Sequence, residues 1–376
     1  MSVLLLIFGL LCFIALVVVH EFGHFIMARR GGIEVEEFGI GFPPRAKVLT
    51  KKNGTTYTLN WLPLGGFVKL KGENDADTEP GTFGAAPLGT KVKVMLAGVV
   101  MNLLAAFAIL TFLALVGMPK LIDNQFTVPS DTKIVRQDVL VNYVESNSPA
   151  EKAGLRVEDK LLNISYNDRK SIVGIVSSDK LPALTKRFQG KSVDIAVKRD
   201  GQVKYLPVKL RSAAEVAKSA KTDHPEGVLG ISTQEFVVQR STWSAPIVAV
   251  GFMKQATELT FKGLGAVVAD LFRGDTAEAS SQVSGPIGII FILKIASTLG
   301  YQSILMIIAI ISLTLAIMNV LPIPALDGGR LFVTLLFRAI RKPLKQRTED
   351  LIHGTGFMVL MFIFVLITIV DVRRFF

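Results

Sequence analysis

The sequence has almost none of the residue type that forms covalent cross-links. Its 376 residues contain a single cysteine, Cys12, within the first apolar run. One cysteine cannot form a disulfide within the chain, and it excludes a metal site built from several thiolates. Histidine is also scarce, with four in the whole chain. The chemistry of the protein must therefore rest on a small number of polar side chains.

Charge is absent from four long segments. No Asp, Glu, Lys or Arg occurs in residues 3–19, 94–118, 303–321 or 355–370, and 50% of the chain is hydrophobic. A helix of about 20 apolar residues crosses a bilayer, so these segments predict about four transmembrane helices. A shorter apolar run, residues 287–293, is either a re-entrant piece or an extension of the third span. The first run lacks the basic start and the cleavage site of a signal peptide, which predicts that it is retained.

The excess of basic residues is better explained by a membrane than by nucleic acid. The net charge is +11, yet no basic helix with interleaved aromatic residues occurs, so we expect no nucleic-acid partner. Lys and Arg collect in the cytosolic loops of membrane proteins, and they are dense in residues 29–93 and 330–347. Both links are therefore placed in the cytosol, with the N-terminus, the middle region and the C-terminus outside. Arg373 and Arg374 oppose this orientation, but the two larger internal links agree with each other.

The predicted fold class is a polytopic α-helical membrane protein with a membrane-associated β-hairpin element and one extracytoplasmic α+β domain. In chain order the predicted parts are transmembrane helix 1 (1–28), a cytosolic link with the β element (29–93), transmembrane helix 2 (94–118), the extracytoplasmic domain (119–235), an amphipathic surface helix (245–273), transmembrane helix 3 with its preceding segment (284–323), a second cytosolic link (324–352) and transmembrane helix 4 (353–372).

Local signals support the parts outside the spans. Asn53-Gly54 lies between β-rich runs, and this pair favours the positive φ angles of a two-residue hairpin turn. In the middle region, Ser148-Pro149 is typical of a helix start and Gly154 of a helix end. Residues 245–273 show an apolar pattern of helical period interrupted by charges. This pattern fits a helix on the outer membrane surface, and a helix packed on the soluble domain is the alternative.

The cluster with the clearest chemistry is His20-Glu21-Phe22-Gly23-His24, an H-E-x-x-H motif. Residues four apart share a face of a helix, so His20 and His24 can bind one metal ion. Glu21 can take a proton from an attacking water and pass it to the leaving nitrogen. The alternative is a chance match at a helix end. The motif directly follows the uncharged first run. A charged group at membrane depth costs about 3 kcal/mol, so such groups are rarely retained without a function, and this favours the metal site.

A catalytic zinc usually has three protein ligands, so a third is expected. Asp327 is the best candidate because it lies in N-x-L-P-x-P-x-L-D-G-G, where Pro322 and Pro324 must interrupt the helix. An ordinary Asp-Gly-Gly turn is the alternative interpretation. His353 is a possible but isolated ligand, and His224 is expected on the outer side. With alternating spans, the ends of the first and third helices face the same side, so Asp327 and the H-E-x-x-H motif reach one membrane depth.

Together these motifs resemble the site-2 protease family of intramembrane zinc metalloproteases, and most closely its bacterial regulator of sigma-E protease type. The resemblance rests on H-E-F-G-H, on N-x-L-P-x-P-x-L-D-G-G, on P-L-G-G-F-V-K at residues 63–69 and on S-G-P-I-G at residues 284–288. The stretch N-S-P-A-E-K-A-G-L in the middle region resembles a PDZ domain, and the chain has room for one such domain.

The resemblance implies specific roles for these residues. His20, His24 and Asp327 would bind Zn²⁺, Glu21 would be the catalytic base, and Asn319 would bind the substrate. Asn102, in the second span, is expected only to form a hydrogen bond between helices.

The resemblance also implies a substrate class and a location. The enzyme would cut within the membrane segments of single-span proteins, such as anti-sigma factors or remnant signal peptides, in regulated intramembrane proteolysis. It would lie in the inner membrane of a bacterium, with its active site toward the cytosol. The outer PDZ-like domain would admit substrates already shortened by a site-1-type protease, and the β element would offer them an edge strand.

Two other hypotheses compete with an active endopeptidase. A catalytically idle, membrane-anchored PDZ scaffold would be expected to have lost Glu21 or a metal ligand, and all of them are present. A transporter built on broken helices would be expected to show an inverted repeat, and none is visible.

Overall fold

The computed structural model describes residues 2–166, 171–199, 201–219, 226–275 and 283–376. These residues form two compact units. The first unit comprises Met1–Met118, Asn124–Asp131 and Ser241–Phe376, and the second comprises Pro119–Asp123 and Thr132–Arg240.

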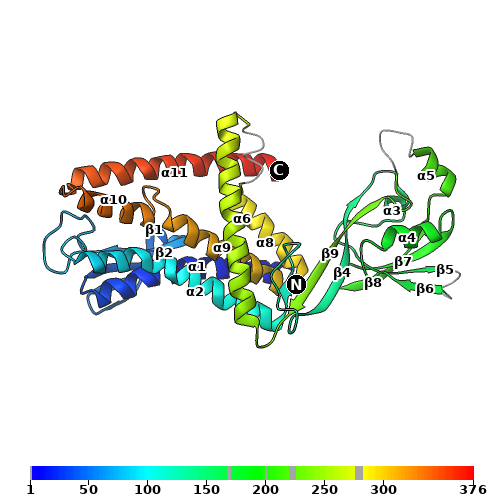
Figure 1. Cartoon of the computed structure of the whole chain (residues 1–376), viewed down its shortest axis with the longest axis horizontal. Helices are drawn as coiled ribbons and strands as arrows, with labels where there is room; N and C mark the ends of the chain where they lie inside the picture. Colours follow the sequence, from blue (N-terminus) through cyan, green and yellow to red (C-terminus); the bar gives the residue numbers. More distant parts are fainter. Residues whose placement is uncertain (1, 167–170, 200, 220–225, 276–282) are drawn as a thin grey trace. The chain divides into compact units, whose positions relative to one another are not determined.

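The first unit is mostly helical (Figure 1). Its helices are α1 (Ser2–Arg30), α2 (Leu88–Val116), α6 (Ala245–Arg273), α8 (Pro286–Leu299), α9 (Tyr301–Val320), α10 (Asp327–Ala339) and α11 (Gln346–Phe375). Among the described residues, four helices are long and apolar enough to cross a membrane, namely α1, α2, α9 and α11. The prediction of four such helices is therefore confirmed.

Two helix boundaries differ from those predicted from charge-free runs. Helix α2 begins at Leu88 rather than at residue 94, so it includes the exposed Lys93 and the buried Lys91, whose charge is paired with Asp75. Within the predicted segment 284–323, the part before the third span is a separate helix rather than a continuous extension of that span. Gly300, with a φ of 113°, separates α8 from α9. A backbone with this φ is disfavoured for residues with a Cβ atom, which explains why the break falls at glycine.

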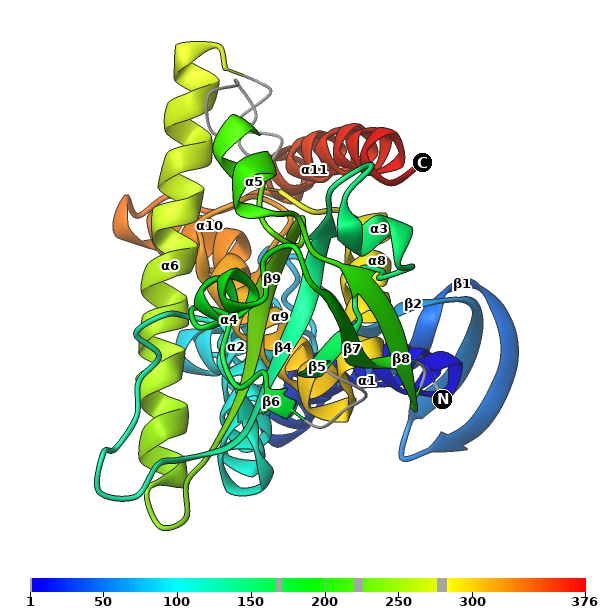
Figure 2. The same ribbon diagram turned by 90° about the vertical axis from the view of Figure 1, so that its right-hand side faces the viewer.

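Helix α6 has a different direction from the helices it packs on. It runs crosswise to α2 and α9 in Figure 1 and stands upright at the side of the unit in Figure 2. Its bounds match the predicted amphipathic segment. The side chains that pack inward are small or apolar, whereas large apolar side chains on its other faces are exposed, including Val250, Leu259, Phe261, Leu271 and Phe272. Its place on a membrane surface stays a prediction.

The link between α1 and α2 carries the β element, formed by β1 (Val35–Lys52) and β2 (Thr55–Leu70). The predicted turn is confirmed, since Asn53 and Gly54 have φ values of 51° and 81°. Residues 37–40 of β1 pair with residues 56–59 of β2, and residues 35–40 pair with residues 66–70. Among the described residues, the segment 66–70 has no second strand partner, so it forms one edge of this sheet.

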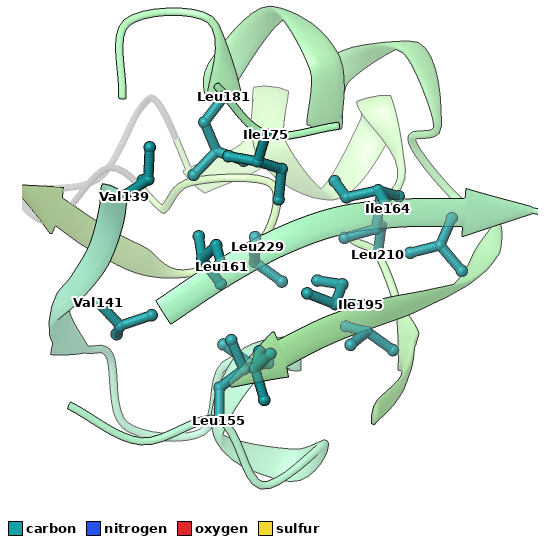
Figure 3. Close-up of a cluster of buried hydrophobic side chains, with 14 of the residues drawn as sticks. Val139, Val141, Leu155, Leu161, Ile164, Ile175, Leu181, Ile195, Leu210 and Leu229 are labelled. Atoms are coloured by element: carbon teal, nitrogen blue, oxygen red, sulfur yellow. The ribbon is translucent and has the colours of Figure 1, made fainter. Parts of the chain in front are cut away.

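The second unit is an α+β domain. Its elements are β4 (Lys133–Val144), α3 (Pro149–Lys152), β5 (Lys160–Tyr166), β6 (Ser171–Gly174), α4 (Leu181–Arg187), β7 (Ser192–Arg199), β8 (Gln202–Lys209), α5 (Ala213–Ser219) and β9 (Ile231–Arg240), with the short β3 (Met118–Pro119) at its boundary. The sheet has the order β9-β4-β5-β7-β8, and β6 pairs with β5. A cluster of aliphatic side chains fills its core, among them Val139, Leu161, Ile164, Ile195 and Leu210 (Figure 3).

The local signals of this unit are confirmed. Ser148 caps α3 by accepting a hydrogen bond from the Glu151 amide at 3.1 Å, and Gly154, with a φ of 80°, follows its end. The predicted domain boundary at residue 235 falls inside β9, which pairs with β4 as far as Arg240. Residues 124–131 belong instead to the first unit, where Asp131 accepts hydrogen bonds from the Ser244 and Thr242 hydroxyls.

Candidate metal centre

Helix α1 brings the two histidines of the H-E-x-x-H motif onto one face. The Nε2 atoms of His20 and His24 lie 3.2 Å apart, and the side chains are only 11% and 12% exposed. Gly23, between them, allows α1 to approach α2 closely, because a Cβ atom there would lie 2.6 Å from the carbonyl oxygen of Ala97. The two histidines of the motif are therefore largely buried against α2 rather than exposed at a helix end.

Asp327 joins the histidines from the far end of the chain. Its Oδ2 atom lies 3.2 Å from His20 Nε2 and 3.3 Å from His24 Nε2. The residue begins α10, directly after the interruption of α9 that the prolines predicted. Gly328 and Gly329 are required by this packing, because a Cβ atom on either would collide with the backbone at the end of α9 and just beyond it.

Helix α2 forms the wall behind the histidines. His24 Nδ1 lies 2.8 Å from the carbonyl oxygen of Val94, and His20 Nδ1 lies 3.2 Å from the side-chain amide of Asn102. Between them, Gly98 faces both rings, since a Cβ atom there would collide with imidazole atoms of His20 and His24. The sequence prediction gave Asn102 only a role between helices. The spacing of Val94, Gly98 and Asn102, four residues apart along one helix face, was the signal that could have identified it.

Glu21 lies on the side of α1 that faces the β element. The Gly66 backbone of β2 passes close to it, because a Cβ atom on Gly66 would lie 3.5 Å from Glu21 Cγ. Glu21 also borders the cavity beside the histidines. This cavity is lined by Glu21, His24, Val68, Leu70, Glu73, Phe83, Val94, Met95, Asp327 and Arg330.

A network of charged side chains borders this cavity. Arg330, three residues after Asp327, donates a hydrogen bond to the carbonyl oxygen of Glu73 at 3.1 Å and lies over the Phe83 ring at 5.4 Å. The buried Lys91 is paired with Asp75, whose amide donates to Glu349 of α11 at 2.8 Å. These contacts join the segment between β2 and α2 to three helices beside the site. This network could not be predicted from the sequence, because its members lie far apart in the chain.

The remaining candidate residues differ in what the structure describes of them. Asn319 is half-buried near the end of α9 and is not among the described residues that line the cavity. His353 is turned toward the loop before Asp327, where its Nδ1 atom accepts a hydrogen bond from the Ala325 amide at 3.2 Å. His224 lies outside the described residues. Of the candidate ligands within the described ranges, His20, His24 and Asp327 are brought together.

The three side chains fit a zinc ion by two tests. A tetrahedral ion with bonds of about 2.0–2.1 Å requires ligand atoms about 3.3–3.4 Å apart, close to the spacing of the three ligand atoms here. The buried Oδ2 atom of Asp327 also makes no hydrogen bond within the described part of the chain. Because a carbonyl oxygen can only accept, His24 Nδ1 must carry the ring proton toward Val94, and this leaves a lone pair on Nε2. No other group of His, Cys, Asp and Glu in the described residues is arranged in this way.

The fold and this site together define a class of protein, the membrane metalloproteases. The sequence model of Peptidase family M50 matches residues 8–363 of the chain. The chain therefore belongs to family M50, the site-2 protease family that its motifs resemble.

Several bacterial relatives resemble the chain over most of its length. A protein of Clostridium perfringens named "Putative zinc metalloprotease" is 33% identical, over 98% of each chain. A protein of the same description in a Nostoc species is 32% identical, over 92% of this chain and 90% of the relative. The regulator of sigma-W protease of Bacillus subtilis is 26% identical, over 99% of this chain and 98% of the relative.

Proposed function

We propose that this protein is a zinc-dependent endopeptidase that cuts peptide bonds inside the membrane segments of single-span proteins. The observation that carries the proposal is the close triangle of His20, His24 and Asp327, buried among helices that are long and apolar enough to cross a membrane. An enzyme that acts on soluble substrates would not require a catalytic site buried among membrane-spanning helices. Membership of family M50 supports the same reaction class.

Each residue of the site has a distinct task in this reaction. His20, His24 and Asp327 would hold Zn²⁺, and the bound ion would supply a positive charge that polarises a peptide carbonyl and lowers the pKa of a water molecule. Glu21 adjoins His20 in sequence and borders the cavity, so it accepts the proton of the attacking water and delivers it to the leaving nitrogen. Asn319, in the last turn of α9, binds the substrate backbone.

The β element suits a substrate that must be unwound. A peptide bond within a helix is covered and hydrogen-bonded, so it has to become extended before water can attack it. The segment 66–70 forms a sheet edge, and its Gly66 lies next to Glu21. An extended substrate that adds as a strand to this edge would gain backbone hydrogen bonds beside the catalytic base.

The biological setting follows from the family and from the charge pattern. We place the protein in the inner membrane of a bacterium as a multi-pass protein, with the site toward the cytosol and the second unit outside. That unit would act as a PDZ-like filter for substrates trimmed first by a site-1-type protease. The substrates would be anti-sigma factors or remnant signal peptides, and the printed name of the Bacillus subtilis relative supports the former.

A Glu21→Gln variant tests the catalytic proposal. The protein is purified in detergent and incubated with a single-span reporter, and zinc is measured in the same preparation. We expect the variant to keep its zinc and to lose at least about 100-fold in cleavage rate, since a general base contributes roughly 10²–10⁴-fold. Cleavage at the wild-type rate would overturn the assignment of Glu21. Loss of both zinc and cleavage would show that Glu21 supports the site rather than acting as its base.

A further inference from the structure

Three residues of α2 meet the two histidines along a single helix face. Val94, Gly98 and Asn102 are spaced by four residues, so they lie one above another on α2. Val94 contacts the Nδ1 side of His24, Asn102 contacts the Nδ1 side of His20, and Gly98 leaves room for both rings. Helix α2 therefore reaches the outer ring nitrogen of both candidate ligands.

The two contacts are alike in position but differ in chemistry. The Val94 carbonyl can only accept, so it fixes the proton of His24 on Nδ1. A side-chain amide can either accept or donate, depending on which of its ends faces the ring. The Nδ2 atom of Asn102 lies 3.2 Å from His20 Nδ1, and its Oδ1 atom is buried without a hydrogen-bond partner within the described part of the chain. Asn102 is itself 0% exposed.

The orientation of this amide decides whether His20 can bind a metal. If Nδ2 donates to His20 Nδ1, the ring proton must sit on Nε2, which points at His24 and Asp327, and no lone pair is left for an ion. If the amide is rotated by half a turn, Oδ1 accepts from the Nδ1 proton. The unpartnered oxygen then has a donor, and the Nε2 lone pair faces the other two ligand atoms.

We propose that Asn102 is a positioning residue of the metal centre, whose Oδ1 atom accepts the Nδ1 proton of His20 and thereby fixes its tautomer and ring orientation. The proposal rests on the proposed zinc site and adds a residue to it. A metal-bound histidine commonly donates its second ring proton to a carbonyl or carboxylate, and loss of such a partner weakens metal binding about 10–100-fold.

Asn102 is also held in place from its other side. Its own carbonyl oxygen accepts a hydrogen bond from the hydroxyl of Ser312 on α9 at 2.8 Å, and Ser312 is fully buried. This contact belongs to helix packing and does not involve the side chain of Asn102. Ser312 therefore offers a matched control that separates packing of α2 on α9 from positioning of His20.

The test compares zinc affinity among full-length variants in detergent, measured by competition with a chelating dye. We expect Asn102→Leu, which has no acceptor, to bind zinc about 10–100-fold more weakly than the wild type. Asn102→Asp keeps an acceptor in nearly the same volume, and its affinity should stay within a few-fold of the wild type. Ser312→Ala should also match the wild type. A purely structural role of Asn102 would not explain why Asp preserves zinc affinity and Leu does not.

Specific results would overturn the proposal. Wild-type affinity in Asn102→Leu, or an equal loss in Ser312→Ala, would show that Asn102 does not position His20. A His20→Ala variant distinguishes this failure from failure of the metal site. If His20→Ala binds zinc as tightly as the wild type, the proposed site is wrong and the role of Asn102 is wrong with it. If only Asn102→Leu is unaffected, the site stands without it.

Discussion

His24 Nδ1 lies 2.8 Å from the carbonyl oxygen of Val94, although the two residues belong to different helices. This contact makes α2 part of the site, as much as the helix that carries the H-E-x-x-H motif. On the same face of α2, Gly98 is the residue that faces both imidazole rings most closely. Zinc binding should therefore depend on the shape of α2 as well as on the ligands.

Gly98→Ala tests this dependence. The added Cβ atom would collide with atoms of both imidazole rings, and overpacking of this kind costs about 1–3 kcal/mol. We expect zinc affinity to fall about 10-fold or more, because the rings must move apart to accommodate the methyl group. Gly89→Ala is the matched control, since a Cβ atom at Gly89 in the first turn of the same helix meets nothing within 4 Å. Equal zinc affinity in both variants would contradict the close contact.

Asp371, at the opposite end of α11 from Glu349, supports a second prediction. Its buried carboxylate accepts hydrogen bonds from the amides of Gly285 and Gly288 at 2.9 and 2.7 Å, and so joins α11 to the start of α8. Asp371→Ala should lower the free energy of unfolding by about 1–3 kcal/mol, because two buried amides lose a charged acceptor. Hydrogen exchange should rise at these two amides. Asp350→Ala, on the exposed surface of the same helix, should change neither quantity.

Asp131 should make the junction before α6 sensitive to acid. Hydrogen bonds from the Ser244 and Thr242 hydroxyls hold the pKa of its carboxyl below the ordinary value. A carboxyl with a lowered pKa in the folded state stabilises the fold above its unfolded pKa of about 4, and this stabilisation is lost as the pH falls through the folded value. Asp131→Asn should therefore lower the thermal midpoint at pH 7, and the difference from wild type should shrink below about pH 4.

The control for this prediction is Asp123→Asn, a change at an exposed aspartate earlier in the chain. It should leave the thermal midpoint near that of the wild type at both pH values. A difference between Asp131→Asn and wild type that stays constant from pH 7 to strongly acid solution would show that the charge of Asp131 is not involved.

The sequence was informative where the physics is local. Runs without charge predicted the four long helices, because length and apolarity suffice to identify them. Asn53-Gly54 and Ser148-Pro149 predicted a turn and a helix start, because their backbone preferences act within a few residues. Asp327 was predicted as the third ligand from the proline-interrupted end of its span and from the direction of the spans, and the structure brings it within 3.3 Å of both histidines.

What the sequence could not predict depends on partners distant in the chain. Lys93 ends the charge-free run, yet α2 continues past it to Leu88. Lys91, in the added turn, is buried and paired with Asp75, which lies outside the helix. The spacing of Asn102 from Gly98 and Val94 places it on their face of α2, but it does not identify the residue that this face contacts, because His20 lies 82 residues away. The break at Gly300 depended on a backbone angle that the surrounding apolar residues do not reveal.

The most direct test of the account is the zinc content of the purified protein and of two variants, measured by elemental analysis after dialysis. We predict one zinc per chain in the wild type, loss of this zinc in Asp327→Ala, and its retention in His353→Ala, whose imidazole faces Ala325 instead. Retention of zinc in Asp327→Ala together with its loss in His353→Ala would contradict the ligand set. Absence of zinc from the wild type after reconstitution with the metal would contradict the central claim itself.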